Sequence, residues 1–421
     1  MEELREPREL RELREIREDM TRKEMQQRNH FIRGVIFGVA SMFIVFSVLF
    51  FIGTNRPTSA RVLDPSSKMS EIIGILEAHY VNDFDVEVLT EAMFIGMLYG
   101  VGDPYTSYMD RRTLASFLEN TEGRYAGIGV RVQIDHSDNR IQILQVFPEG
   151  PSQRAGLVPG DKIMRVGGVE VSGANFSEAV TMMRGTPNTR LTLTIFRQST
   201  NETFDVEVVR SEIEVPTVEH RMLDDEIGYI QISSFDRMTY PQFMTALNGL
   251  SQQNMRGLII DVRNNPGGLL DSVVRITNEL VPEGLILYTE DKHGDREYMR
   301  ANSRQINVPL AVLVNENSAS ASEVLAGAVR DTGSGVLVGN RTFGKGVVQS
   351  LFQLSDGSGV KVTVARYYTP GGYSIHGEGI APDVLLETDR ETSLRVTSMD
   401  LWQDEQLMAA MDIMRSTIGR N

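Results

Sequence analysis

Residues 315–331 read NENSASASEVLAGAVRD, and they follow the apolar run PLAVLVN at 309–315. This pattern predicts a buried strand that ends in a serine-rich turn and passes directly into a helix. Before this segment, apolar runs such as IGYIQI and GLIIDV alternate with amphipathic helical runs such as GLLDSVVRITNEL. Continuous apolar strands separated by helices are typical of a layered α/β core. We therefore expect such a core over residues 213–385.

Residues 120–212 have a different character. Short alternating runs such as GIGVRVQI and RIQILQVF are separated by turn clusters, which predicts a β-rich module. Its segment EGPSQRAGLVPGDKIMRVGGVEV, at 149–171, and the earlier YAGIGV, at 125–130, together resemble a PDZ domain. A loop of this kind offers backbone N–H groups to a C-terminal carboxylate, while a strand edge pairs with the peptide.

The resemblance to PDZ domains implies a peptide-binding loop with four residues in it. Gly127 and Gly129 would expose backbone N–H groups, and Ile128 and Val130 would line the pocket for the last side chain. A plain turn at the entry to a strand is the alternative interpretation of the two glycines. Partners are therefore expected to be protein substrates, bound through their C-termini.

The N-terminal part contains a candidate membrane anchor. Residues 34–53 read GVIFGVASMFIVFSVLFFIG without one charge, which is long enough for a helix that crosses the hydrocarbon layer. The charged arm 1–33 precedes it, and four basic residues against three favour a cytoplasmic N-terminus: Arg22, Lys23, Arg28 and Arg33 before the span, and Arg56, Arg61 and Lys68 after it. We expect single-pass insertion with the catalytic part outside the cytoplasm, and a cleaved signal peptide is the alternative.

Helical periodicity is also expected at two other places. Residues 64–119 carry apolar residues at three- and four-residue spacing, and the extension 386–421 contains the helix-like QDEQLMAAMDIMRS. The predicted fold class is therefore α+β multidomain: a transmembrane helix, a helical segment, a PDZ-like β-rich module and an α/β layered core. Oligomers are possible, and the pattern of the extension does not decide whether it mediates assembly.

Composition excludes several classes of function. A formal net charge of −15 disfavours binding to nucleic acid, which needs lysine and arginine to neutralise phosphates. The absence of cysteine excludes a thiolate nucleophile and cysteine-based zinc sites. No HExxH motif is present, and the short glycine motifs lack a nucleotide-binding context. We expect no metal and no cofactor.

Three segments carry the expected chemistry: DVRNNPGG at 261–268, the serine-rich turn already quoted, and NRTFGKGVVQ at 340–349. Together they resemble the tail-specific or C-terminal processing peptidases, serine peptidase family S41, and the resemblance extends from residue 64 to about 385. It implies that Ser320 is the nucleophile, Lys345 its general base and Gln349 the residue that orients the lysine.

Elementary chemistry agrees with these roles. Ser320 would begin a helix, so that the N–H of Ala321 is a natural oxyanion donor, with a second donor from Gly267 or else Gly268. A strand through FGKGVVQSLFQL would place Lys345 and Gln349 on one face. The lysine must be desolvated to act as a base, and Phe343 and Val347 are the apolar neighbours expected to do this.

Alternatives remain open for both the nucleophile and the general base. Chemistry alone does not choose Ser320 over Ser318 or Ser322, which could all cap the helix, and the choice rests on the resemblance. His376 is the histidine nearest the matched segments and the candidate for a Ser–His arrangement. Asp331 also matches a position of the family and is interpreted as structural.

The expected function is a membrane-anchored serine endopeptidase of the cell envelope that recruits proteins by their C-termini for processing or degradation. A PDZ-based envelope scaffold with an inactive peptidase core is the non-enzymatic alternative. A small-molecule esterase or amidase is another, and the PDZ-like module argues against it.

Overall fold

The computed structural model describes residues 64–302, 305–395 and 403–419. The chain divides into two compact units, residues 1–86 and 87–421. The described part of the first unit contains helix α2 (Pro65–His79), whose first turn is capped by the side chain of Asp64. The predicted arm 1–33 and span 34–53 lie outside the described residues. Within the described ranges no helix is long and apolar enough to cross a membrane.

The second unit begins with helices, as predicted for this part of the chain. Helix α3 (Val86–Tyr99) leads through the GDPYT turn into the short strand β1 (Ser107–Met109) and then helix α4 (Arg111–Glu122). Asp110 caps α4 by accepting the N–H of Thr113 at 2.7 Å, and the helix ends at Gly123 in a left-handed conformation, with a φ of 67°.

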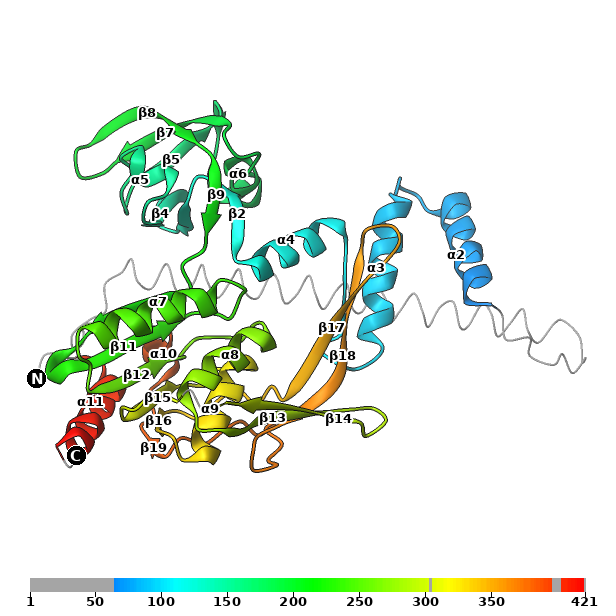
Figure 1. The fold of residues 1–421 in the computed structure, drawn as a ribbon. Helices are drawn as coiled ribbons and strands as arrows, with labels where there is room; N and C mark the ends of the chain where they lie inside the picture. Colours follow the sequence, from blue (N-terminus) through cyan, green and yellow to red (C-terminus); the bar gives the residue numbers. More distant parts are fainter. Residues whose placement is uncertain (1–63, 303–304, 396–402, 420–421) are drawn as a thin grey trace, which may run out of the picture. The chain divides into compact units, whose positions relative to one another are not determined.

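The predicted β-rich module follows α4 (Figure 1). Its six-stranded sheet has the order β3-β4-β5-β7-β8, with β6 paired to β5, and all its pairs are antiparallel. Strands β2 and β9 pair separately, so that the chain enters and leaves the module along one ribbon. The bounds are β2 (Arg124–Gly127), β3 (Val130–Asp135), β4 (Arg140–Val146), α5 (Pro151–Arg154), β5 (Lys162–Val166), β6 (Val169–Glu170), α6 (Phe176–Met183), β7 (Arg190–Arg197), β8 (Glu202–Val209) and β9 (Ser211–Glu214).

The α/β core is built on a second six-stranded sheet with the order β10-β11-β12-β15-β16-β19. Its strands are parallel except for β10, which is antiparallel to β11. Strands β12 and β15 are buried at every residue, as their continuous apolar runs predict. The bounds are β10 (Val218–Met222), β11 (Ile227–Ile232), β12 (Gly257–Asp261), β15 (Leu310–Val314), β16 (Val336–Gly339) and β19 (Val384–Leu385).

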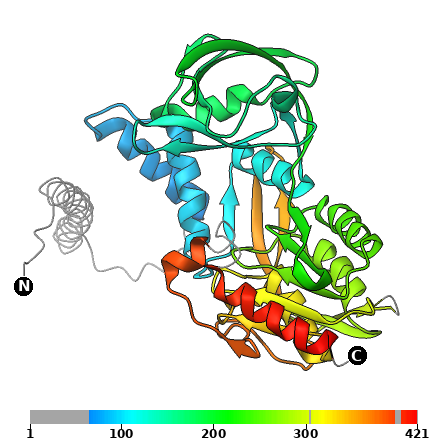
Figure 2. The same ribbon diagram turned by 90° about the vertical axis from the view of Figure 1, so that its left-hand side faces the viewer.

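Helices cover both faces of this sheet. Helices α7 (Thr239–Gln252), α8 (Leu270–Leu280) and α9 (Ala321–Thr332) pack on the face that includes Ile260 and Val312. The C-terminal helix α11 (Glu405–Ile418) packs on the opposite face, against Ile259 and Leu313 (Figure 2). Within the extension, residues of α11 therefore contribute to the core, and α10 (Arg390–Arg395) precedes them.

A smaller antiparallel sheet completes the core, with the order β1-β18-β13-β14 and β17 paired to β18. Strand β1, which precedes the β-rich module in sequence, pairs with β18 near the end of the chain. The peptidase-like part is thus assembled from segments on both sides of the module. The bounds are β13 (Gly284–Asp291), β14 (Arg296–Ala301), β17 (Val347–Gln353) and β18 (Gly359–Tyr368).

Candidate active site

Ser320 lies between β15 and α9 in an uncommon backbone conformation. Its φ is 55° and its ψ is −112°, and it immediately precedes the first residue of the helix. Such a conformation costs roughly 1–3 kcal/mol and persists only where surrounding contacts enforce it. Here the Ser320 N–H donates to the Glu323 Oε2 at 2.9 Å, and its carbonyl accepts the Glu323 N–H at 2.8 Å.

Ser318, Ser320 and Ser322, among which sequence chemistry could not choose, differ in their contacts and exposure. The Ser318 hydroxyl donates to the Val262 carbonyl at 2.8 Å, and the Ser322 hydroxyl donates to the Asn265 carbonyl at 2.9 Å. Both side chains are fully buried. Ser320 is only half-buried and lines a cleft. Of the three hydroxyls, the Ser320 hydroxyl is therefore the one at the cleft, and its role as nucleophile stays a prediction.

The cleft has a volume of about 650 Å³ and is lined mainly by apolar side chains, with two lysines and two aspartates among them. One wall comes from α4, through Phe117 and Leu118, and another from residues 266–271, which form the loop before α8 and its first turn. Ser320 and Lys345 both lie on its lining. A concave, mostly apolar site with a few polar groups is the form expected of a ligand-binding site.

Lys345 lies in the loop between β16 and β17. The prediction that the strand already includes Lys345 is therefore wrong. Strand β17 begins at Val347, and a bulge between Val348 and Gln349 interrupts its alternation. The Lys345 N–H donates to the Glu323 Oε2 at 2.8 Å, so backbone contacts, not a strand ladder, place this residue.

Burial lowers the pKa of Lys345 below its usual value, and the positive charge of Lys361 lowers it further. The charges of Asp103 and Glu323 act in the opposite direction. The ammonium lies 4.8 Å from the centre of the Tyr105 ring, in the GDPYT turn. Phe343, which we expected to desolvate the lysine, is 57% exposed, whereas Val347 is buried.

Gln349 lines the same cleft but makes a different contact from the predicted one. Its side-chain amide donates to the Val347 carbonyl at 3.3 Å. Within the described residues no hydrogen bond joins the side chains of Ser320, Lys345 and Gln349. Catalytic hydrogen bonds are often long before substrate binds, so the role of Gln349 stays a prediction.

Glu323 is a residue of the candidate site that the sequence analysis missed. Its side chain is fully buried and its carboxylate accepts four hydrogen bonds. Burial raises the pKa of Glu323, while these donors favour the ionised form. The spacing Ser320-x-x-Glu323 is that of a capping box, and this signal could have identified it. Its donors are the N–H groups of Ser320, Gly344 and Lys345 and the hydroxyl of Thr342.

The candidate oxyanion donors differ in availability. Ala321 is the first residue of α9, where backbone N–H groups have no acceptor within the helix. Gly267 has a φ of 104°, and a Cβ there would lie 2.8 Å from the Ser320 Cβ. Its N–H donates to the Asn265 Oδ1 at 2.9 Å, so it can serve an oxyanion only after leaving that partner. Gly268 lies against Phe235, because a Cβ there would meet the Phe235 carbonyl oxygen at 2.0 Å.

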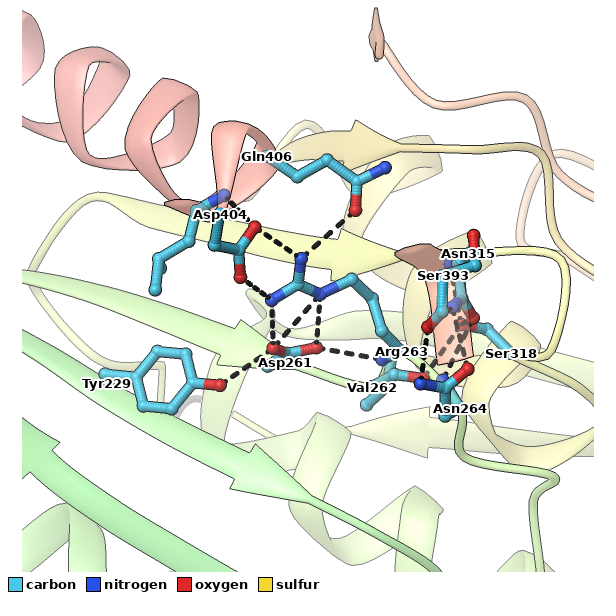
Figure 3. Close-up of polar contacts among 11 residues, drawn as sticks. Tyr229, Asp261, Val262, Arg263, Asn264, Asn315, Ser318, Ser393, Asp404 and Gln406 are labelled. Carbon is cyan, nitrogen blue, oxygen red and sulfur yellow. Dashed lines mark hydrogen bonds and ion pairs between the residues drawn. The ribbon is translucent and has the colours of Figure 1, made fainter. Parts of the chain in front are cut away.

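A buried ion cluster surrounds Arg263, in the DVRNNPGG segment (Figure 3). The Arg263 guanidinium lies between two carboxylates, with Nη2 2.6 Å from the Asp261 Oδ2 and 2.7 Å from the Asp404 Oδ2. Asp404 also caps α11, where its Oδ1 accepts the Leu407 N–H at 3.0 Å. The C-terminal helix is thereby tied to the DVRNNPGG segment, a link that no local pattern indicated.

The predicted peptide-binding residues lie at the junction of β2 and β3. Gly127 is the last residue of β2, Gly129 has a φ of 75°, and Val130 is the first residue of β3. The Ile128 side chain is only 2% exposed and packs in the core of the module. In this conformation it does not form an open pocket wall, and the binding role of the four residues stays a prediction.

His376 and Asp331 are the remaining candidates from the sequence. His376 is exposed and is not part of the cleft lining. Asp331 accepts the Gly371 N–H at 2.9 Å and pairs with its neighbour Arg330, which are structural contacts. In the described part of the chain no group of three or more His, Cys, Asp or Glu side chains could hold a metal ion.

Comparison with known proteins identifies the family. Residues 226–386 match peptidase family S41, residues 116–196 match the PDZ domain, and residues 53–113 match the N-terminal domain of the activating protease CtpB. The carboxyl-terminal-processing protease of Synechocystis sp. is 37% identical over 328 residues, which are 77% of this chain and 76% of that protein. The chain belongs to peptidase family S41.

Other S41 members agree with this assignment. The carboxy-terminal processing protease CtpA of Bacillus subtilis is 36% identical over 322 residues, 76% of this chain and 68% of that protein. A crystal structure of an S41 protease from Bacteroides fragilis has a TM-score of 0.52 at 16% identity, covers 80% of this chain and 93% of that chain, and supports the fold alone. The predictions of an S41 serine peptidase with a PDZ domain are confirmed.

Proposed function

We propose that the chain is a membrane-anchored C-terminal processing endopeptidase that uses Ser320 as nucleophile and Lys345 as general base. The neutral Lys345 amine takes the hydroxyl proton as the Ser320 Oγ attacks the scissile carbonyl carbon. The proton then passes to the leaving amine, and an ester between substrate and Ser320 remains. Water attacks this ester with Lys345 again as base, which releases the new carboxylate and restores the serine.

One observation carries this proposal. Ser320 and Lys345 line the same cleft, and one carboxylate, that of Glu323, accepts the backbone N–H of each. Two residues that lie apart in sequence are therefore held in a common frame. The lowered pKa of Lys345 further supports its role, because a lysine must lose its proton to act as a base.

The Ala321 N–H, at the start of α9, would bind the oxyanion of the tetrahedral intermediate, aided by the helix dipole. Two contacts must change before turnover under this proposal. Gln349 must leave the Val347 carbonyl to orient Lys345, and Gly267 must leave Asn265 if it is the second donor. Substrate binding would supply the free energy for both exchanges.

The PDZ domain would recruit substrates by their C-termini through the loop at Gly127–Val130. A matched pair of substrates tests this, one with a free terminal carboxylate and one with an amidated terminus. Both end in the same apolar residue. We expect amidation to slow cleavage, mainly through a higher KM, because it removes the charge that the loop N–H groups bind. Equal rates would remove C-terminal recruitment and leave the peptidase assignment intact.

Anchoring through residues 34–53 and a location in the cell envelope complete the proposal. The support is the charge-free run of that length and the basic residues before it. Protease added to wall-less cells should degrade the peptidase part and spare residues 1–33. Full protection of the peptidase part would reverse the proposed topology.

A further inference from the structure

The hydroxyl of Tyr367, on strand β18, lies between the backbone carbonyls of the two proposed catalytic residues. It is 2.6 Å from the Lys345 carbonyl oxygen and 2.9 Å from the Ser320 carbonyl oxygen. A phenol has one hydrogen to donate, so the two carbonyls share it in a three-centre hydrogen bond. The family roles of serine, lysine and glutamine do not include this residue.

Tyr367 and Glu323 bind the backbones of the same two residues, Glu323 at their N–H groups and Tyr367 at their carbonyls. The Glu323 Oε2 accepts the N–H of Ser320 at 2.9 Å and of Lys345 at 2.8 Å. The Tyr367 hydroxyl takes the carbonyl of each. Both residues are thus held at their N–H and at their C=O, by one acidic and one phenolic side chain.

The tyrosine is itself well fixed. It is 3% exposed, lies in β18, and donates its backbone N–H to the Gly346 carbonyl at 3.1 Å. Burial raises the pKa of Tyr367 well above its usual value, so the hydroxyl keeps its proton over the working pH range. It can therefore act as a constant donor.

Neither catalytic residue is placed by regular secondary structure. Ser320 has a positive φ of 55°, and Lys345 lies between Gly344, with a φ of 92°, and Gly346. Glycines on both sides give the lysine backbone unusual freedom. Contacts from outside the loop must therefore decide where the amine lies relative to the Ser320 hydroxyl.

We propose that Tyr367 is a positioning residue that sets the separation of nucleophile and base by binding the carbonyls of Ser320 and Lys345 through its single hydroxyl. The proposal rests on the assignment of these two residues as the dyad. It does not require Tyr367 to contact substrate or to transfer a proton. Loss of the hydroxyl would free the lysine loop and leave the aromatic ring packed in the core.

Tyr367→Phe in the full-length chain, purified in detergent, tests this. A misplacement of about 1 Å can cost on the order of 100-fold in rate, so we expect kcat to fall roughly 10- to 100-fold with little change in KM. Acylation of Ser320 by a fluorophosphonate should slow in parallel. Its pH profile should also move, because Lys345 changes its surroundings, whereas a purely structural role would leave that profile unchanged.

Tyr368→Phe is the matched control. Tyr368 is the next residue on β18, and its ring stacks on Tyr288 with centroids 4.8 Å apart. This variant loses a phenolic hydroxyl from the adjacent position of the strand, and its Ser320 should be labelled at the wild-type rate. If Tyr367→Phe unfolds at a lower temperature, acylation per folded molecule is measured about 10 °C below its own midpoint.

The possible outcomes distinguish a failure of the positioning role of Tyr367 from a failure of the Ser320–Lys345 dyad. A wild-type acylation rate and pH profile in Tyr367→Phe would overturn the positioning role and leave the dyad in place. Equal losses in Tyr367→Phe and Tyr368→Phe would also overturn it, because the effect would then belong to the strand. Failure of the wild-type enzyme to label at Ser320 would contradict the dyad itself.

Discussion

The Glu323 carboxylate accepts the backbone N–H of Lys345 at 2.8 Å, although the two residues belong to a helix and to a distant loop. The same oxygen accepts the N–H of Ser320 at 2.9 Å. A buried acceptor shared by the two residues helps to fix their relative position, together with the Tyr367 hydroxyl that binds their carbonyls.

Glu323→Gln should therefore impair both catalysis and stability. An amide keeps one acceptor oxygen but presents an NH₂ group to the N–H donors that the carboxylate now satisfies. We expect acylation to slow roughly 10-fold or more, and a loss of about 1–3 kcal/mol in the free energy of unfolding. Fluorophosphonate labelling and chemical denaturation measure the two effects. A variant with unchanged labelling would show that the shared carboxylate does not position the dyad.

Lys345→Arg should abolish turnover and leave the fold intact. Arginine keeps the positive charge but does not deprotonate, so it cannot act as a base. His376→Ala is the contrasting variant, since this histidine is exposed and lies outside the cleft lining, and it should remain active. Peptide cleavage rates, measured on the folded variants, test both expectations. Near wild-type activity in Lys345→Arg would transfer the role of base to another group.

The pH dependence should follow the deprotonation of Lys345. The base works in its neutral form, so kcat/KM should rise with pH up to the pKa of Lys345 and then level off. The charge of Lys361 lowers that pKa and that of Asp103 raises it. Lys361→Met should therefore move the profile to higher pH, and Asp103→Asn should move it to lower pH. Shifts in the same direction, or none, would contradict the assignment of Lys345 as the titrating group.

Arg263→Met should strongly destabilise the enzyme. It would leave the buried carboxylates of Asp261 and Asp404 without their shared cation, and breaking such a cluster costs about 3–5 kcal/mol. Arg256→Met is the matched control, because Arg256 and Glu226 are both 56% exposed and 3.9 Å apart, and exposed pairs contribute about 1 kcal/mol or less. Urea denaturation compares them, and equal losses would contradict a structural role for the buried cluster.

Sequence patterns correctly predicted the strands whose two faces are both buried. The apolar runs at 257–262 and 309–315 correspond to β12 and β15. A short, continuous apolar run is typical of a fully buried strand, and both segments are such strands. The serine turn and the helix after it were also predicted correctly, since α9 starts at Ala321. The strand expected through Lys345 failed because flanking glycines and the Glu323 carboxylate hold that segment as a loop.

Other parts of the site could not be predicted because they depend on long-range contacts. Tyr367 and Lys361 reach the cleft only through the position of β18 in the smaller sheet, which includes β1 from before the PDZ domain. Tyr105 reaches Lys345 in the same way, from the GDPYT turn that precedes β1. The pairing of Arg263 with Asp404 joins two segments that no periodicity connects.

Identification of the serine that forms the acyl-enzyme tests the central claim most directly. The wild-type enzyme is labelled with a fluorophosphonate, and fragmentation of the peptide that spans residues 315–330 by mass spectrometry assigns the adduct among Ser318, Ser320 and Ser322. We predict an adduct on Ser320 that forms faster as pH rises. It should be absent from Ser320→Ala and strongly slowed in Lys345→Ala, and Ser320→Ala should not cleave an unfolded protein. An adduct on Ser318 or Ser322, or cleavage that survives in Ser320→Ala, would contradict the account.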